Sequence, residues 1–420
     1  MISDPVQLYQ LSFLIALIFI LLVPFALAGL TLINTGLGRC RSAAHAMTSS
    51  LIVIGVAIVV YLVFGFGFQG YRLVTIWGAP YAGLVLRPYF LRGVPWESPL
   101  CLAGTLGMLS VALASLVPLG ATAERWQLRA ACGSTVFLAG FTYPIFVRWT
   151  SGLLVSLGLR AAFGDILDAG GSGSIQALGG LTALSLSCLL GPRRGKYSDQ
   201  GLPAAIPAHN AVFVLFGCML AWVGWLGLNA AGAMLYAEMQ PEGSVLVLIN
   251  TTFSACAAAL TSAAVTRVRF RKPDASLIAN GWMAGLVASS AGCATLKPAT
   301  AMLTGLVAGA LVVFSVEFLE FRLKVDDPCG SVSVHAVCGI WGLLAVGIFT
   351  SASQFMAQLV GVAMLLGFVF PMTYFLNWLL SRLIPYRVSV DGERQGLDLH
   401  ELGADAYPEF VVHTDEFIQR

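Results

Sequence analysis

Two short segments of the sequence repeat one pattern of polar residues within long apolar stretches. Residues 168–180 read DAGGSGSIQALGG and residues 327–339 read DPCGSVSVHAVCG, so six of the thirteen positions are identical. Each copy places one polar side chain eight residues after an aspartate, Gln176 in the first copy and His335 in the second. Such groups are costly at membrane depth and usually face a pathway or a bundle interior. The pair indicates a binding or conduction site, and a plain hydrogen bond between two helices is the alternative.

The composition of the chain is that of an integral membrane protein. Of its 420 residues, 58% are hydrophobic and only 10% are charged, and the mean hydropathy is +0.83. A soluble protein keeps roughly a quarter of its residues charged, so this chain has too few to cover a globule. The net charge of +2 argues against a nucleic-acid partner. The nine Cys form no C-x-x-C pair, so we expect no metal site and no disulfide framework.

Eleven apolar segments are candidates for membrane-spanning helices, which need about 20 residues each. They cover residues 8–36, 46–68, 100–122, 130–148, 174–191, 210–235, 244–265, 276–292, 299–321, 335–350 and 355–383. The eighth and the tenth segments are short and rich in glycine. The sequence therefore predicts an all-α, multi-pass membrane protein embedded in a lipid bilayer.

The distribution of Lys and Arg predicts how the chain crosses the membrane. With the N-terminus outside, 17 of the 23 basic residues fall in inner loops and in the C-terminal region, as the positive-inside rule requires. The composition changes after Pro385, because residues 386–420 hold eight of the 21 acidic residues. We therefore divide the chain into a membrane domain, 1–385, and a cytoplasmic tail, 386–420, that lies against it.

The two copies of the polar pattern have opposite topology. The first copy opens the fifth predicted span from the outside, and the second opens the tenth span from the inside. Inverted repeats of this kind usually share a site near the bilayer midplane, at the interface between the repeats. We therefore expect Gln176 and His335 to lie close together inside the membrane.

Several motifs make the sequence similar to the ammonium transporter/Rh (Amt/Mep/Rh) family. They are DDPCG at 326–330, VHAVCGIWG at 334–342, AER at 123–125, GPRRG at 191–195, HN at 209–210, GWLGLNA at 224–230, ANG at 279–281, AGL at 284–286, GLD at 396–398 and AYP at 406–408. The resemblance covers essentially the whole chain, and residues 168–176 resemble the Rh branch most. It implies eleven helices in a five-plus-five inverted repeat, and a homotrimer in the cell membrane with one pore per subunit. It also implies ammonium or ammonia as the ligand, no cofactor and no enzymatic activity within these residues.

The central pair departs from the family. The resemblance implies two pore histidines, one from each repeat; here the second is His335, and Gln176 stands at the first position. Two imidazoles in contact can pass a proton, whereas a carboxamide does not titrate. Binding of a cation is compatible with Gln176, while proton movement is expected to suffer.

The outer vestibule also departs from the family, whose transporters hold the cation there with aromatic and hydroxyl groups. By resemblance, Ser110 and Leu228 replace two Phe, Thr150 or Ser151 beside Trp149 replaces a Trp, and Gly232 replaces a Ser. Asp168, which supports the external cation site in the family, is retained, and Asn229 of the GWLGLNA motif is counted with the pore residues. An N-cap of the fifth span is the structural alternative for Asp168, and both roles are compatible.

Three functions follow from these residues. The first is a conducting ammonium/ammonia channel, and the second is an ammonium receptor with reduced or absent conduction. The third is a Rh-like pore for another small neutral solute. The family resemblance favours the channel, whereas the lost histidine and the altered vestibule favour the receptor.

The tail bears on the same choice. Gly396, Asp398 and Tyr407 match the family's tail motifs and are expected to couple the tail to the membrane domain. The sequence runs to Arg420 with no clear stop after these motifs. A signalling module such as a kinase or cyclase after Arg420 and an ordinary short tail are both compatible with this pattern. A PII-type regulator at the inner face is a further possible partner.

Overall fold

The computed structural model describes residues 5–69, 89–156 and 165–408, apart from the side chains of residues 5 and 151–156. In these ranges the regular secondary structure is helical, and two isolated β-bridges join Trp126 to Arg387 and Tyr197 to Pro203. Ten helical segments in the described ranges are long and apolar enough to cross a membrane. The predicted all-α membrane fold is confirmed.

All eleven predicted spans are helical. The α-helices are α1 (Pro5–Leu22), α2 (Pro24–Leu37), α3 (Ala43–Val60), α4 (Phe66–Gln69), α5 (Pro99–Ala121), α6 (Leu128–Phe137), α7 (Tyr143–Ser156), α9 (Leu178–Leu190), α10 (Ala211–Tyr236), α11 (Ser244–Phe270), α12 (Ala275–Ser290), α13 (Pro298–Phe321), α14 (Cys338–Thr350), α15 (Ala352–Met364), α16 (Phe370–Leu383) and α17 (Val390–Gln395). Four spans join two consecutive helices: α1 with α2, α3 with α4, α6 with α7, and α15 with α16. The eighth predicted span is α12, whose 16 residues extend about 24 Å. This is shorter than the roughly 30 Å hydrocarbon core, which is why ten segments reach full length.

Side chains at the helix starts explain where several spans begin. Ser98, Asn210, Asp274 and Ser351 each accept a hydrogen bond from a backbone N–H in the first turn of α5, α10, α12 and α15, respectively. These residue types are the preferred N-caps, because their oxygens satisfy N–H groups that have no partner within the helix. Proline at the first position of α2, α5 and α13 fits the same rule, since its missing N–H is not needed there.

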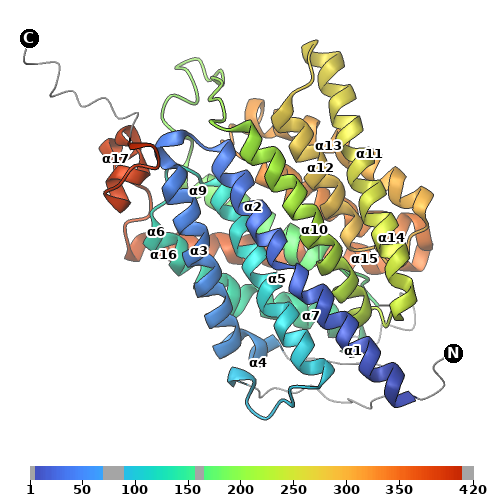
Figure 1. Ribbon diagram of the computed structural model, residues 1–420. Coiled ribbons are helices and arrows are strands. Elements are labelled where there is room, and N and C mark those ends of the chain that lie inside the picture. The colour runs from blue at the N-terminus through green and yellow to red at the C-terminus, as the bar shows by residue number, and fades with distance from the viewer. Residues whose placement is uncertain (1–4, 70–88, 157–164, 409–420) are drawn as a thin grey trace, which may run out of the picture.

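Long helices pack side by side (Figure 1), and small residues lie at several of their contacts. Helix α10 lies along α2, and α11 lies against α12 and α13. A Cβ atom on Gly224 of α10 would lie 2.0 Å from the backbone nitrogen of Ala26 in α2. A Cβ atom on Gly309 of α13 would lie 2.2 Å from the carbonyl oxygen of Ala258 in α11. Only glycine allows so close an approach, as is common between membrane helices.

The two sequence repeats pack on each other in the same way from both sides. Gly180 of α9 lies against Ala336, where a Cβ would be 2.2 Å from the Ala336 nitrogen. Gly339 of α14 lies against Ala177, where a Cβ would be 2.9 Å from the Ala177 nitrogen. These four residues occupy equivalent positions in the two copies, so the contact is reciprocal. This reciprocal contact supports the predicted inverted repeat and brings the two copies together.

The described part of the tail lies against the membrane domain. Helix α17 and the short π-helical turn Asp398–Leu402 sit beside the start of α3 (Figure 1). The backbone N–H of Val388 donates to the carbonyl of Arg125, and Arg387 donates to the carbonyl of Leu190. Glu393 and Asp398 are buried, so the acidic composition of the tail does not mean that all its carboxylates face water.

Candidate ligand cavity and central side-chain pair

Gln176 and His335 are in direct contact in the interior of the molecule. Nδ1 of His335 donates a hydrogen bond to Oε1 of Gln176 across 2.7 Å, and both side chains are buried. The Nε2 atom of Gln176 has no hydrogen-bond partner among the described residues. The proximity predicted from the repeat is therefore present, and one polar donor of the pair is left free.

Equivalent backbone geometry in the two copies positions this pair. Each copy starts with a glycine in the left-handed region, Gly171 at φ 84° and Gly330 at φ 69°. A π-helical turn follows in each, Ser172–Ala177 and Val332–Val337. Residues with a Cβ rarely adopt such φ values, so these glycines fix where each turn begins. The polar side chain is the fifth residue after this glycine in both copies, which is why the two meet.

The two aspartates cap these turns. Asp168 accepts hydrogen bonds from the N–H groups of Gly173 and Ser174, the shortest being 2.8 Å. Asp327 accepts from Ser331 and Val332 at 3.0 and 2.7 Å. Burial raises the pKa of both carboxyls, to about 6 for Asp327, against the opposing effect of these N–H groups. Asp168 therefore caps the turn of the first copy, and Asp327 caps the equivalent turn of the second copy.

A cavity of about 200 Å³ lies beside the first copy. Its lining includes Asp168 together with four of the positions expected in the vestibule: Ser110, Thr150, Leu228 and Gly232. They come from the 165–171 segment, α5, α7 and α10. Gly232 leaves no room for a larger residue, because a Cβ would lie 2.1 Å from the Ala169 carbonyl oxygen. The structure thus gathers five residues that lie far apart in the sequence around one hollow.

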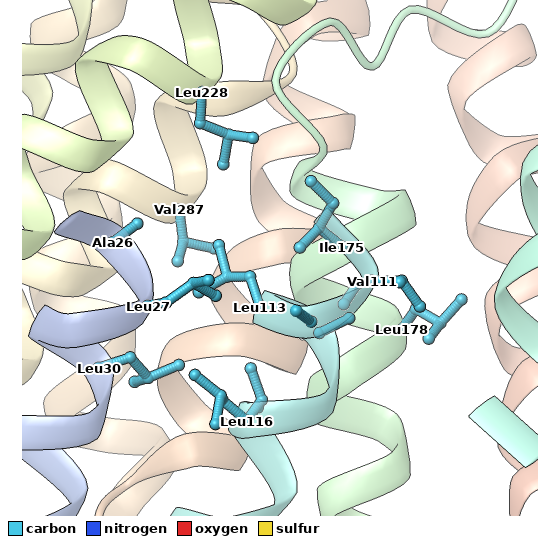
Figure 2. Close-up of a cluster of buried hydrophobic side chains, with 14 of the residues drawn as sticks. Ala26, Leu27, Leu30, Val111, Leu113, Leu116, Ile175, Leu178, Leu228 and Val287 are labelled. Carbon is cyan, nitrogen blue, oxygen red and sulfur yellow. The ribbon is translucent and has the colours of Figure 1, made fainter. Parts of the chain in front are cut away.

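A cluster of buried apolar side chains (Figure 2) shares two residues with the lining of this cavity. Leu228 and Ile175 line the cavity, and both belong to the cluster together with Leu113 and Val287. All four side chains are buried. Gln176 and His335 line neither this cavity nor the smaller one of about 30 Å³ near His45. The central pair is therefore not part of the wall of this cavity.

Two expected site residues lie outside the cavity lining. Trp149 is 40% exposed, and its ring centre is 4.6 Å from that of Phe368. The indole therefore faces away from the cavity, and Thr150 takes the lining position. Asn229 is buried behind the wall, where Nδ2 donates to Oγ1 of Thr251 at 2.9 Å. The side chain of Ser151 lies outside the described part of the chain.

Six polar residues of the lining carried no signal in the sequence: Gln69, Tyr143, Asp165, Tyr236, Glu238 and Thr295. Gln69 ends α4, and its Oε1 accepts a hydrogen bond from the Tyr61 hydroxyl at 2.9 Å. Glu238 follows α10 with a φ of 52°. None of them belongs to a motif or to the repeat, so only the three-dimensional structure reveals them. They add carboxylates and hydrogen-bonding groups to a wall that has no described Lys or Arg.

A buried ion cluster supports the inner end of the second copy. Arg193 contacts both oxygens of Asp326, at 2.9 and 3.0 Å, and its Nη1 donates to Glu124 at 2.9 Å. Burial alone would raise the pKa of Asp326, but the contacts with Arg193 hold it below its usual range. Burial lowers the pKa of Arg125 to about 10. Since Asp326 precedes the cap Asp327, this cluster fixes the entry to the turn that carries His335.

The three tail residues of interest make specific contacts. Asp398 accepts hydrogen bonds from the N–H groups of Ala44 and His45 at the start of α3, at 3.1 and 2.7 Å. Gly396 has a φ of 102° and lies against Arg41. The Tyr407 hydroxyl is 3.3 Å from Nε2 of His209. Each contact joins the tail to a loop or a helix start of the membrane domain.

The paired inverted turns and the helical bundle define a multi-pass membrane protein of the inverted-repeat class. Residues 14–407 match the Ammonium Transporter Family, and the chain belongs to this family. It is 32% identical to the ammonium transporter Amt2 of Archaeoglobus fulgidus, over 96% of this chain and 90% of the relative. The family membership inferred from the motifs is confirmed.

Solved structures confirm the fold. The chain is similar to a protein described as "Sensor Amt Protein", with a TM-score of 0.85 and 24% identity, covering 94% of this chain and 99% of the other. It is also similar to Rh50 of Nitrosomonas europaea, with a TM-score of 0.71 and 20% identity, covering 98% and 96%. The Amt and Rh branches therefore share their architecture with this chain.

Proposed function

We propose that the protein is an ammonium receptor of the ammonium transporter family. It binds the cation in the outer cavity and conducts little or none of it. The observation that carries this proposal is the 2.7 Å contact between Gln176 and His335. In this proposal the N-terminus lies outside the cell membrane, the tail lies in the cytoplasm, and three copies assemble as a homotrimer.

The chemistry of the pair argues against proton movement through it. Two imidazoles can share a proton, because each ring nitrogen can donate or accept. The Gln176 amide does not titrate, and its Oε1 already accepts from Nδ1 of His335. A proton taken up at the remaining ring nitrogen of His335 then has no second imidazole to pass to. If ammonium gave its proton to His335, the proton would therefore have no second imidazole through which to leave.

The apolar cluster opposes passage of the cation itself. Leu113, Ile175, Leu228 and Val287 are buried and offer no hydrogen-bonding side chain. Moving an unpaired charge into such surroundings carries a large desolvation cost. The outer cavity, by contrast, is lined by three carboxylates and several hydroxyl groups. Binding is thus favoured on the outer side and onward movement is not.

Contacts from the pore to the tail offer a route for a signal. Asp327 caps the turn that carries His335, and its neighbour Asp326 is held by Arg193. The next residue, Arg194, donates its backbone N–H to Glu393 of α17 at 2.7 Å. In our proposal, occupancy of the membrane domain shifts these contacts and moves the tail. A fused signalling domain or a PII-type regulator would then read that movement.

A conducting ammonium channel is the second candidate. It is favoured by the similarity to Amt2 of Archaeoglobus fulgidus, which is described as an ammonium transporter. The similarity to the structure described as "Sensor Amt Protein" supports the receptor instead. In both functions ammonium binds in the same outer cavity. The two functions differ in whether the bound substrate then moves past Leu228 and crosses the membrane.

Flux and binding measured on one preparation distinguish the candidates. The purified protein is placed in vesicles for ammonium uptake and current, and ammonium binding is titrated on the same sample. The receptor predicts saturable binding with flux far below that of a family member with two pore histidines. Equal flux would overturn the receptor and establish the channel. High flux of a neutral solute without charge movement would instead establish a Rh-like pore.

A further inference from the structure

The outer cavity is much larger than an ammonium ion requires. Its volume is about 200 Å³, whereas roughly 10–15 Å³ of such space holds one water molecule. Ammonium is close to water in size, so it would leave most of the hollow to solvent. The small residues Ser110 and Gly232 contribute to this space on two of its walls. The volume therefore suits a ligand of several non-hydrogen atoms.

The lining combines apolar and polar groups in a way that suits an amphipathic cation. Leu106, Val147 and Leu235 supply hydrocarbon contacts, while Asp168 and Gln69 supply a charge and an amide. Ligand sites generally join apolar walls to a few polar groups that fix orientation. A short alkyl chain with a cation at one end and a hydrogen-bonding group at the other matches this arrangement.

Asp168 offers its negative charge to a cation. Its carboxylate accepts hydrogen bonds from the N–H groups of Gly173 and Ser174, and Ser172 and the Ser174 hydroxyl also act on it. The carboxylate is also a wall of the cavity. A primary ammonium group, with three donors, can therefore approach it without displacing the helix cap.

Gln69 offers a donor to the other end of a ligand. Its Oε1 accepts from the Tyr61 hydroxyl at 2.9 Å, which fixes the orientation of the amide. Its Nε2 group is a donor on a side chain that lines the cavity and is only 2% exposed. An amide N–H in this position can donate to a hydroxyl oxygen of a ligand.

We propose that the outer cavity binds short hydroxylated primary ammonium ions, of which 2-hydroxyethylammonium is the simplest. The ammonium group lies toward Asp168, the alkyl chain lies against the leucine and valine side chains, and the hydroxyl accepts from Gln69. This inference rests on the proposed function, because it takes the outer cavity to be the cation site. It extends the ligand class from ammonium to organic ions that fill the space.

The test is a competition series on the purified full chain. Ammonium, ethylammonium, 2-hydroxyethylammonium and neutral 1,2-ethanediol are titrated separately and against one another by calorimetry. We expect 2-hydroxyethylammonium to bind at least as tightly as ammonium, about fivefold more tightly than ethylammonium, and to displace ammonium. The fivefold factor corresponds to one hydrogen bond of about 1 kcal/mol. The neutral diol is expected not to compete.

A pair of variants locates the hydroxyl contact. Replacing Gln69 alone would also remove an acceptor of the Tyr61 hydroxyl, so Tyr61→Phe with Gln69→Leu is compared with Tyr61→Phe alone. We expect the double variant to lose the fivefold preference over ethylammonium, while the single variant keeps it. Thermal unfolding checks that both variants remain folded, and the wild-type series tests the ligand class in either case.

The outcomes separate this inference from the proposed function. Absence of ammonium binding would overturn both. Ammonium binding without competition from 2-hydroxyethylammonium would overturn the inference alone and leave the receptor standing. An unchanged preference in the folded double variant would overturn the assignment of Gln69.

Discussion

Nδ1 of His335 donates a hydrogen bond to Oε1 of Gln176 across 2.7 Å, although 159 residues separate them in the sequence. Both residues lie in a π-helical turn and are the fifth residue after a left-handed glycine, Gly171 or Gly330, in their own copy of the repeat. The backbone positions are therefore equivalent, and the side-chain chemistry is not. One member titrates and the other only exchanges hydrogen bonds. This difference is the physical basis for expecting binding without efficient proton movement.

Restoring a second imidazole is expected to alter transport more than binding. In the Gln176→His variant, two rings in contact can share one proton, which gives ammonia a neutral partner and the proton a separate route. We expect a change in the charge moved per substrate or in its pH dependence, with ammonium affinity within about twofold of the wild type. Current and uptake recorded together in vesicles measure this ratio.

The reciprocal substitution provides the control. His335→Gln leaves two carboxamides that can still hydrogen-bond but cannot titrate, so any residual proton movement should disappear. A folded Gln176→His variant as silent as the wild type would show that the lost histidine is not the block. The receptor would then depend on the small residues Ser110 and Gly232, the apolar cluster and the tail.

Removing the charge of Asp168 is expected to weaken ammonium binding. Two charges 4 Å apart interact by about 1–4 kcal/mol at effective dielectrics between bulk water and a protein surface, so Asp168→Asn should cost about fivefold or more in affinity. Burial raises the pKa of Asp168 above its ordinary 3.8. Only the ionised carboxylate of Asp168 attracts the cation. As the pH falls, ammonium binding to the wild type should therefore begin to weaken before the pH reaches 3.8. Calorimetric titrations across pH measure both effects.

Asp327→Asn is the matched control, because Asp327 makes the same kind of cap in the second copy. Both substitutions weaken a helix cap, which costs about 0.5–2 kcal/mol of stability. Only Asp168 lines the outer cavity, so only its substitution should reduce the affinity. Equal affinities in the two variants, with both folded, would remove Asp168 from the site.

Much of the architecture could be predicted from local sequence properties. Apolar segments of membrane length are easily recognised in a sequence. They predict helices, because each backbone N–H and C=O group in lipid must be hydrogen-bonded within the helix. The repeat placed Gln176 and His335 together because it preserves the spacing from Gly171 and Gly330 to the polar side chain. Ser110, Thr150, Leu228 and Gly232 are assigned to the vestibule by the resemblance to the family, not by a local pattern.

Other features depend on contacts that no local pattern encodes. Trp149 and Thr150 are neighbours, and only the rotation of α7 decides that Thr150 lines the cavity while the indole packs on Phe368. Gln69 precedes residues 70–88, which have no motif, and its role depends on the Tyr61 hydroxyl. Likewise, Asp398 is buried because it caps the start of helix α3. The residue whose N–H it accepts, His45, is 353 positions away in the sequence.

The close contact at Gly232 predicts that a larger residue at this position disturbs the cavity wall. A Cβ in Gly232→Ala would lie 2.1 Å from the Ala169 carbonyl oxygen, and overpacking of this kind costs about 1–3 kcal/mol. The displaced Ala169 and Gly170 backbone lines the cavity, so ammonium affinity should fall together with the unfolding temperature. The same experiments on the Gly55→Ala variant provide the comparison, because nothing lies within 4 Å of a Cβ there. A normal affinity for Gly232→Ala would contradict the close contact.

The tail is held by two carboxylates at the start of α3. Asp398 caps the helix through the N–H of His45, and Glu401 is 2.8 Å from Nε2 of the same residue. Glu401 also accepts from the N–H of Leu128 at 3.1 Å. Burial alone would raise the pKa of Glu401, but the contacts with His45 and Leu128 hold it below its ordinary 4.5. The ionised carboxylate is therefore favoured in the docked tail.

Docking of the tail should be lost by substitution of Asp398 and by acid. Asp398→Asn removes one cap oxygen, at a cost of about 0.5–2 kcal/mol, and should raise hydrogen exchange of residues 390–402 by about twofold to thirtyfold. Because the docked pKa of Glu401 is lowered, its contribution is complete above pH 4.5 and disappears as the pH falls through the docked value. Asp405→Asn is the matched control, since among the described residues the hydrogen bond that Asp405 accepts comes from the N–H of Tyr407 within the tail. Equal exchange in the Asp398 and Asp405 variants would show that the Asp398 cap does not hold the tail.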